Sequence, residues 1–218
     1  MMVGPIKIWL VASARPSLTE RFAEDRAREI LDAAFLRYES EAPSLAREQN
    51  LGGRVMVHCA ALTAAVYRVL IDEGLSEVEA RALTAKVTEA IYRKMAEVPW
   101  LAARLSARSP LVRLRRATNA FRRFPFGSPS YRMEDVPSDE RTVAFDVKRC
   151  PVAEYFQTQG LAELCVESFC NLDFALATKW GARLERTSTL ASGAEHCDFR
   201  WHLESQGPGA AHRGRGDK

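Results

Sequence analysis

The chain of 218 residues is 47% hydrophobic and 27% charged, an ordinary globular composition, and it is long enough to bury a substantial core. No apolar run approaches the roughly 18 residues that a membrane-spanning helix needs, and residues 6–12 are too short for a secretory signal. The five cysteines include no CxxC pair and fit reduced thiols better than a disulfide framework. We therefore expect a cytoplasmic protein.

Basic side chains are concentrated in one stretch of the chain. Residues 98–133 contain no acid and eight arginines: Arg104, Arg108, Arg113, Arg115, Arg116, Arg122, Arg123 and Arg132. The tail from residue 206 adds +2, so the rest of the chain carries −7 of the total of +3. The arginines could contact nucleic acid, contact anionic lipid as a basic amphipathic helix, or pair with the acidic remainder. We favour pairing within or between subunits, expect no nucleic-acid partner, and keep a homo-oligomer open.

The first part of the chain has the apolar spacing of helices. Ser17 or Thr19 can cap a helix over residues 20–38. Gly52-Gly53 should then break the chain before a second helix over residues 54–73.

A third helix is marked by its start signal. Ser76 and Glu79 form a capping box, in which each side chain can bond the backbone of the other. This helix should end near Met95, and Pro99 and Pro110 then divide the arginine-rich stretch into one or two short helices.

The last third of the chain mixes strands and helices. Residues 141–148 alternate with apolar side chains on one face and predict a strand, whereas Pro151 begins a helical run and a second helix covers residues 161–180. Loops are expected at residues 124–130 and 135–139, and a hairpin is expected from strands at 182–190 and 196–203 joined at 192–194.

These elements predict an α+β fold, with an N-terminal helical half of three to five helices packed on a C-terminal small antiparallel sheet and one or two helices. We expect an extension over residues 1–16, a helical region over 17–134, an α+β region over 135–204 that forms one unit with the helices, and a disordered tail over 205–218.

Cysteines and acids gather in the helix expected at 161–180. Glu163, Glu167, Cys170 and Asp173 follow helical spacing on one side, while Cys165 falls on the opposite, apolar side. Nearby carboxylates raise the pKa of a thiol, so Cys170 would be a weak nucleophile unless a cation lies close. The alternative interpretation is an acidic, solvated helix face.

The last strand separates its residues into two faces. Alternation places Cys197, Phe199, Trp201 and Leu203 on one side, and Asp198, Arg200 and His202 on the other. Cys197 is therefore either a packing residue or the base of a pocket, and His196 could supply the missing cation or simply be exposed. The gaps between Cys150, Cys170 and Cys197 match no standard zinc spacing, so we expect no metal and no other cofactor.

Four short motifs in this region resemble the L-2-amino-thiazoline-4-carboxylic acid hydrolase family. They are Arg149-Cys150-Pro151, Cys170-x-x-Asp173, the segment from Arg186 to Gly193, and the segment from Cys197 to Trp201. The resemblance covers roughly residues 140–203 well and implies hydrolysis of a cyclic amidine. In the named substrate, water adds to the ring carbon between sulfur and nitrogen, and the ring opens to an N-carbamoyl-cysteine.

That reaction needs an activated water or thiolate, stabilisation of a tetrahedral centre, a proton for the leaving thiolate and an anchor for the substrate carboxylate. We expect Asp173 to be the general base, with a pKa raised by burial and by Glu167. Cys170 is the candidate nucleophile, or a polar contact if water attacks directly.

The other expected site residues surround these two. Cys197 is included with the catalytic group, and the expected substrate contacts are Cys150, Arg186, His196 and Arg200. Arg186 or Arg200 could clamp the carboxylate, although alternation points Arg200 away from Cys197. Two alternatives stay open: a non-catalytic module that binds a small ligand or metal through its cysteines, and a basic membrane-surface or assembly protein.

Overall fold

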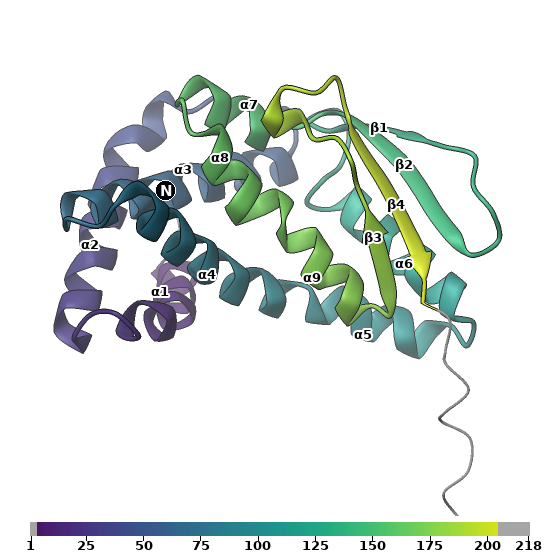
Figure 1. The fold of residues 1–218 in the computed structure, drawn as a ribbon, viewed down its shortest axis with the longest axis horizontal. Coiled ribbons are helices and arrows are strands. Elements are labelled where there is room, and N and C mark those ends of the chain that lie inside the picture. Colours follow the sequence, from purple (N-terminus) through teal and green to yellow (C-terminus); the bar gives the residue numbers. More distant parts are fainter. Residues whose placement is uncertain (1–3, 205–218) are drawn as a thin grey trace, which may run out of the picture.

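The computed structural model describes residues 4–204, and within them the helices come first and the antiparallel sheet comes last (Figure 1). The helices are α1 (Gly4–Thr19), α2 (Glu24–Glu41), α3 (Leu51–Asp72), α4 (Glu77–Met95), α5 (Glu97–Ser106), α6 (Pro110–Arg123), α7 (Pro151–Thr158), α8 (Ala162–Cys165) and α9 (Leu172–Lys179). The strands are β1 (Arg132–Asp135), β2 (Thr142–Arg149), β3 (Ala182–Glu185) and β4 (Cys197–Leu203). The α+β prediction is confirmed, and the expected tail lies outside the described residues.

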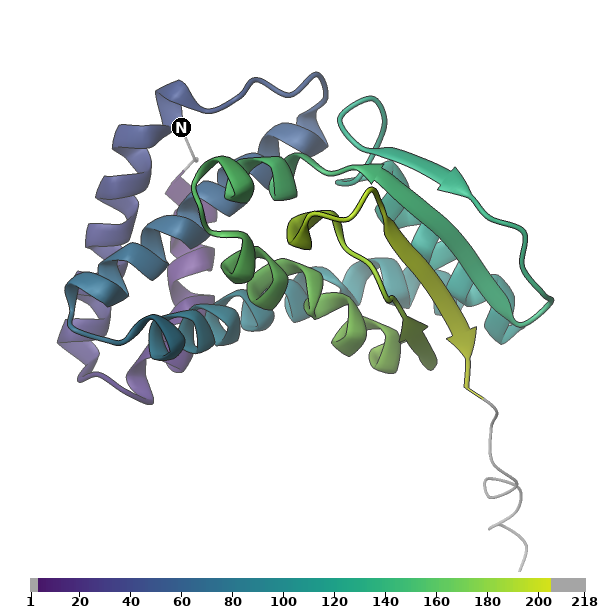
Figure 2. The same ribbon diagram turned by 45° about the horizontal axis from the view of Figure 1, so that its top comes forward.

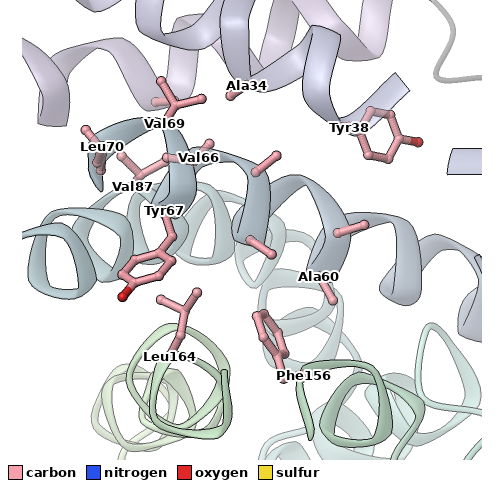
Figure 3. Packing of buried hydrophobic residues seen from close by; sticks show 14 of the residues in the cluster. Ala34, Tyr38, Ala60, Val66, Tyr67, Val69, Leu70, Val87, Phe156 and Leu164 are labelled. Atoms are coloured by element: carbon pink, nitrogen blue, oxygen red, sulfur yellow. The ribbon is translucent and has the colours of Figure 1, made fainter. Parts of the chain in front are cut away.

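Helix α3 is the centre of the helical half. Its small residues Ala60 and Ala64 are fully buried and let neighbouring helices approach closely. Figure 3 shows α3 between Ala34 and Tyr38 of α2 on one side and Phe156 and Leu164, from α7 and α8, on the other. The first and last parts of the chain therefore share one core.

By length and composition α3 could cross a membrane, which differs from our expectation that no stretch of the chain would be apolar enough. The helix has 22 residues, and 61% of its apolar window is buried inside the protein. This burial is typical of the core helix of a globular protein, which satisfies the same composition test.

The expected limits of the first helices need correction. Residues 4–19, assigned to an extension and to a capping segment, form α1, which packs against α4. Helix α2 begins after Ala23 without a side-chain cap, so Ser17 and Thr19 do not cap it. The capping box of Ser76 and Glu79 is confirmed at the start of α4.

Gly52 and Gly53 do not break the chain but form the first turn of α3. Asn50 caps this turn by accepting a hydrogen bond from the Gly53 amide at 2.6 Å. A Cβ on Gly52 would lie 2.1 Å from the carbonyl oxygen of Pro125, and one on Gly53 would lie 2.4 Å from the Ser130 hydroxyl oxygen. The glycines therefore allow the expected loop at 124–130 to dock on α3.

The sheet has the strand order β1-β2-β4-β3, and each neighbouring pair is antiparallel. The expected hairpin is confirmed, although its first strand ends at Glu185 and a longer loop leads to β4. Strand β1 was missed, because its four residues are mostly exposed and show no apolar alternation. In Figure 2 the sheet lies beside the helical part, with α6 behind it.

The arginine-rich stretch forms α5 and α6, as expected, and the two helices pack on each other. Within the described part of the chain, Arg122 is the one of the eight arginines that forms an ion pair, with Asp135 at 2.6 Å. Pairing of the other arginines with a second subunit stays a prediction.

Candidate active site

A cavity of about 120 Å³ lies between the sheet and the helices, several times the roughly 10–15 Å³ that one water molecule needs. Its walls come from α4, α6, the run from α8 to α9, and the inner face of β2 and β4. Nine aromatic side chains line it: Tyr92, Phe121, Phe126, Tyr131, Phe145, Phe169, Trp180, Phe199 and Trp201. The lining also contains four thiols, one carboxylate and two guanidinium groups: Cys150, Cys165, Cys170, Cys197, Asp173, Arg122 and Arg186.

The structure therefore brings together Cys150, Cys170, Asp173, Cys197 and Arg186, all of which the sequence named as site residues. The alternation of β4 placed Cys197 on the cavity side, as expected. The roles of these residues remain predictions, but their shared location is a finding.

A π turn explains why Cys165 also lines the cavity. Between α8 and α9, residues 166–170 form this turn, closed by a hydrogen bond of 2.9 Å from the Asn171 amide to the Val166 carbonyl. In an α-helix, side chains five residues apart differ by about 140° in direction, whereas the i→i+5 bonding of a π turn brings them toward one side. The expected α-helical phasing, which put Cys165 and Cys170 on opposite sides, is therefore wrong.

Asp173 is held from two directions. Its Oδ1 accepts a hydrogen bond from the Tyr92 hydroxyl at 3.1 Å, and its Oδ2 lies 3.3 Å from Nη1 of Arg186. Burial raises the pKa of Asp173 to about 6, against the opposing effects of Arg186 and Tyr92. The expected direction is confirmed, but its cause is burial alone, because Glu167 points away and pairs with Arg81 at 3.1 Å.

Cys170 differs from the other thiols of the cavity because its pKa is lowered. The main cause is the neighbouring Cys165 thiol acting as a hydrogen-bond donor, and Thr189 and Arg186 act in the same direction against the effect of burial. The Thr189 hydroxyl lies 3.5 Å from the Cys170 sulfur. The cation near this thiol is therefore Arg186, which also donates to the Cys170 carbonyl at 2.9 Å.

Cys197, at the start of β4, contacts the same Thr189 hydroxyl as Cys170. Its sulfur accepts a hydrogen bond from the Leu190 amide at 3.2 Å and donates to the Thr189 hydroxyl at 3.5 Å. Burial raises the pKa of both Cys197 and Cys150, which keeps these two thiols protonated at neutral pH. Among the four thiols that line the cavity, the pKa is therefore lowered at Cys170 and raised at the other three.

Asp198, on the outer face of β4, fixes the loop that carries Arg186 and Thr189. Its carboxylate accepts hydrogen bonds of 2.6–2.9 Å from the amides and hydroxyls of Thr187 and Ser188. Burial alone would raise the pKa of Asp198, but these hydrogen bonds outweigh it and hold the pKa well below the usual range. Asp198 thus acts on the cavity through the loop without lining it.

Two expected substrate contacts lie outside the cavity. His196 approaches Asp146 at 3.6 Å, and Arg200 donates to Asp146 at 2.9 Å and to the Phe145 carbonyl at 3.1 Å. Neither residue lines the cavity. The structure therefore does not support His196 as the cation for Cys170 or Arg200 as the carboxylate clamp.

Arg149, part of the resemblance motif, has a structural role. Its guanidinium bonds both oxygens of the buried Glu48 at 2.9 and 3.0 Å and the Ser130 carbonyl at 2.7 Å. This ion pair ties the end of β2 to the loop before α3. It thereby holds the neighbouring Cys150 at the cavity wall.

Sequence reasoning missed Tyr92, Thr189 and Arg122. Tyr92 lies 81 residues from the carboxylate it bonds, so no local spacing could reveal it. Thr189 belonged to the quoted hairpin motif and was the residue most open to detection. Within the described residues, no three His, Cys, Asp or Glu side chains gather as a metal site.

The chain was compared with known proteins. The model of the L-2-amino-thiazoline-4-carboxylic acid hydrolase family matches residues 54–201, which include every residue that lines the cavity. None of the curated proteins matches. A similar solved structure is that of the Fe(II) unliganded H-NOX protein from K. algicida, with 9% identity, a TM-score of 0.46, and coverage of 90% of this chain and 95% of that chain. At this TM-score the likeness has no bearing on the site.

Proposed function

Since the chain belongs to the L-2-amino-thiazoline-4-carboxylic acid hydrolase family, we propose that it is a hydrolase that opens a small cyclic amidine of the thiazoline type. The observation that supports this most directly is the grouping of Cys170, Asp173 and Arg186 in one largely apolar cavity. An apolar cavity excludes bulk water and strengthens the electrostatic interactions of the reacting groups.

The first step would use Cys170 as the nucleophile. Asp173 takes the proton of the Cys170 thiol, the sulfur adds to the ring carbon between nitrogen and sulfur, and a carbon–sulfur bond to the protein forms. The ring carbon–sulfur bond then breaks, and the leaving sulfur takes the proton of Asp173. A carboxyl group with a pKa of about 6 can give up this proton near neutral pH.

The second step would return both groups to their starting forms. The Asp173 carboxylate takes a proton from water, and the water oxygen adds to the same carbon. The bond to Cys170 breaks, which releases the thiolate and leaves a ureido group in the product. Over both steps one water is consumed, and the pair of Cys170 and Asp173 again holds one proton.

Arg186 and Tyr92 would position the acid–base group. Arg186 bonds both the Cys170 carbonyl and the Asp173 carboxylate, so it fixes the nucleophile and the base relative to each other. Tyr92 holds the other carboxylate oxygen. Their hydrogen bonds keep Asp173 in one orientation through both proton transfers.

The test is turnover of L-2-amino-thiazoline-4-carboxylate, followed by the appearance of a free thiol in the product. We expect Cys170→Ala and Asp173→Asn to lower kcat by about a thousandfold or more, because each removes a group that acts in both steps. The matched controls are Cys59→Ala, a half-buried thiol in α3, and Glu167→Gln, a carboxylate on the same helical run that faces Arg81. Both controls should stay within a few-fold of the unmodified protein.

The outcomes separate the two routes to the product. If Cys170→Ala keeps substantial activity while Asp173→Asn does not, water attacks directly with Asp173 as the base. If both variants keep full activity, the assignment of the site is wrong.

A further inference from the structure

Three side chains that line the cavity carry hydrogen-bond donors without partners among the described residues. Among the described residues, the Tyr131 hydroxyl and the indole nitrogens of Trp180 and Trp201 are buried and make no hydrogen bond. All three side chains line the cavity, and each residue is at most 3% exposed. Buried donors without acceptors are uncommon and call for an explanation such as a bound ligand. A ligand with acceptor atoms would satisfy them.

Arg122 supplies a positive charge at the same cavity. Its guanidinium lies 4.8 Å above the centre of the Phe145 ring, and its side chain is 21% exposed. The adjacent Phe121 packs edge-on against Trp180 at 5.3 Å between ring centres. Arg122 therefore lies beside the aromatic wall that carries the two unpartnered indole nitrogens.

The other cation of the cavity is already engaged. Arg186 has a side chain only 5% exposed and is bonded to Asp173 and to the Cys170 carbonyl. Since Asp173 offsets its charge, Arg186 belongs to the reacting groups. Arg122 is left as the cation that can meet an anionic group of the ligand.

The present partner of Arg122 can be displaced at little cost. Asp135 lies at the end of β1 with its side chain 78% exposed. An ion pair with so exposed a carboxylate contributes little to stability. A ligand carboxylate held against the aromatic wall would form a stronger charge-assisted bond, because less water competes there.

We propose that Arg122 binds the anionic group of the substrate in place of Asp135, and that Tyr131, Trp180 and Trp201 donate hydrogen bonds to acceptor atoms of the same ligand. This inference rests on the proposed function for the identity of the substrate class. It assigns the substrate anchor to α6, on the sheet side of the cavity, and leaves Arg186 to the reacting groups.

Binding of two neutral-ring probes without turnover tests this inference. The probes are 2-aminothiazole-4-carboxylate and 2-aminothiazole-4-carboxamide, which differ in charge and hardly in shape, and titration calorimetry measures their Kd. We expect the carboxylate to bind about ten- to a hundredfold more tightly to the unmodified protein. Arg122→Gln should abolish this preference, and Arg122→Lys should keep part of it.

Two further variants make the comparison specific. Arg123→Gln removes the next arginine of α6, which is exposed and does not line the cavity, and it should leave the preference unchanged. Asp135→Asn should tighten carboxylate binding a few-fold and leave carboxamide binding alone, because it removes the competing acid. Far-UV circular dichroism and the thermal midpoint verify that each variant is folded.

The inference is overturned if Arg122→Gln keeps the unmodified preference for the carboxylate, or if the unmodified protein binds neither probe. If the proposed hydrolase function were wrong, the experiments would give a different result. In that case the preference would persist and depend on Arg122, while the thiazoline substrate would not be turned over.

Discussion

The two faces of β4 differ in how completely their polar groups are satisfied. On the outer face, Asp198 accepts hydrogen bonds from Thr187 and Ser188, and Arg200 pairs with Asp146. On the inner face, the sulfur of Cys197 has weak contacts and the indole nitrogen of Trp201 has no partner among the described residues.

This difference separates the groups that hold the sheet together from those available to a ligand. Satisfied polar groups stabilise the fold and have little left to offer a substrate, whereas unsatisfied buried groups reduce stability and remain free to bind. A charged residue within a resemblance motif, such as Arg200, therefore indicates a site residue only once its partners are known.

The largest effect on stability is expected from removing the Trp201 ring on the inner face of β4. Trp201 stacks on Trp180 at 5.6 Å between ring centres and is 3% exposed. Trp201→Ala should lower the free energy of unfolding by about 3–5 kcal/mol, because it removes a large buried ring. Chemical denaturation measures the change.

Trp201→Phe is the matched variant. It keeps most of the ring contacts and removes the unpartnered N–H, so it should cost much less than the alanine variant. Equal destabilisation by both variants would show that the indole N–H has a partner, and would remove one support for the inner face as a ligand surface.

A smaller effect with a distinct pH dependence is expected at Asp173. Its pKa of about 6 in the folded protein lies above the value of about 3.9 in an unfolded chain. Ionisation of Asp173 therefore lowers the free energy of unfolding. The stability that its protonated form contributes is fully present below about pH 4 and is lost as the pH rises through about 6. Asp173→Asn does not titrate, so its stability relative to the unmodified protein should rise by about 2–3 kcal/mol between pH 4 and pH 7.

Asp198 provides the opposite case on the outer face. Its pKa is lowered in the folded protein. The stability that the ionised Asp198 contributes is therefore present above about pH 4 and is lost as the pH falls below that value. The stability difference between the unmodified protein and Asp198→Asn should be constant from pH 5 to pH 7 and shrink in acid. Chemical denaturation at several pH values gives the free energy of unfolding of both variants. If the two plots of stability against pH were parallel, they would contradict the contrast between the two faces of β4.

The smallest effect is expected from Arg200 on the outer face. Arg200→Gln removes the pair with Asp146, which is partly exposed, and should lower the free energy of unfolding by about 1 kcal/mol or less. Because Arg200 does not line the cavity, its kcat and KM for the thiazoline should change less than about twofold. A large rise in KM would restore Arg200 as the substrate clamp.

The sequence by itself was sufficient for the assignment of side chains to the faces of β4. A strand has a strict period of two, so once Cys197 faces inward, Phe199 and Trp201 must follow it and Arg200 must face outward. The capping box of α4 was similarly local, because both of its partners lie within one turn. The motifs of the last third also pointed to the family that the comparison shows.

The tertiary structure decided which groups surround Cys170 and Asp173. A π turn inserted between α8 and α9 changed the phase of the helix, which the regular 3.6-residue period could not anticipate. The direction of Arg186 depends on a loop held by Asp198, and Tyr92 reaches Asp173 from a helix far away in the sequence. Local periodicity thus fixed the faces of the strand, whereas bonds between distant residues fixed the charge and hydrogen bonding of the site.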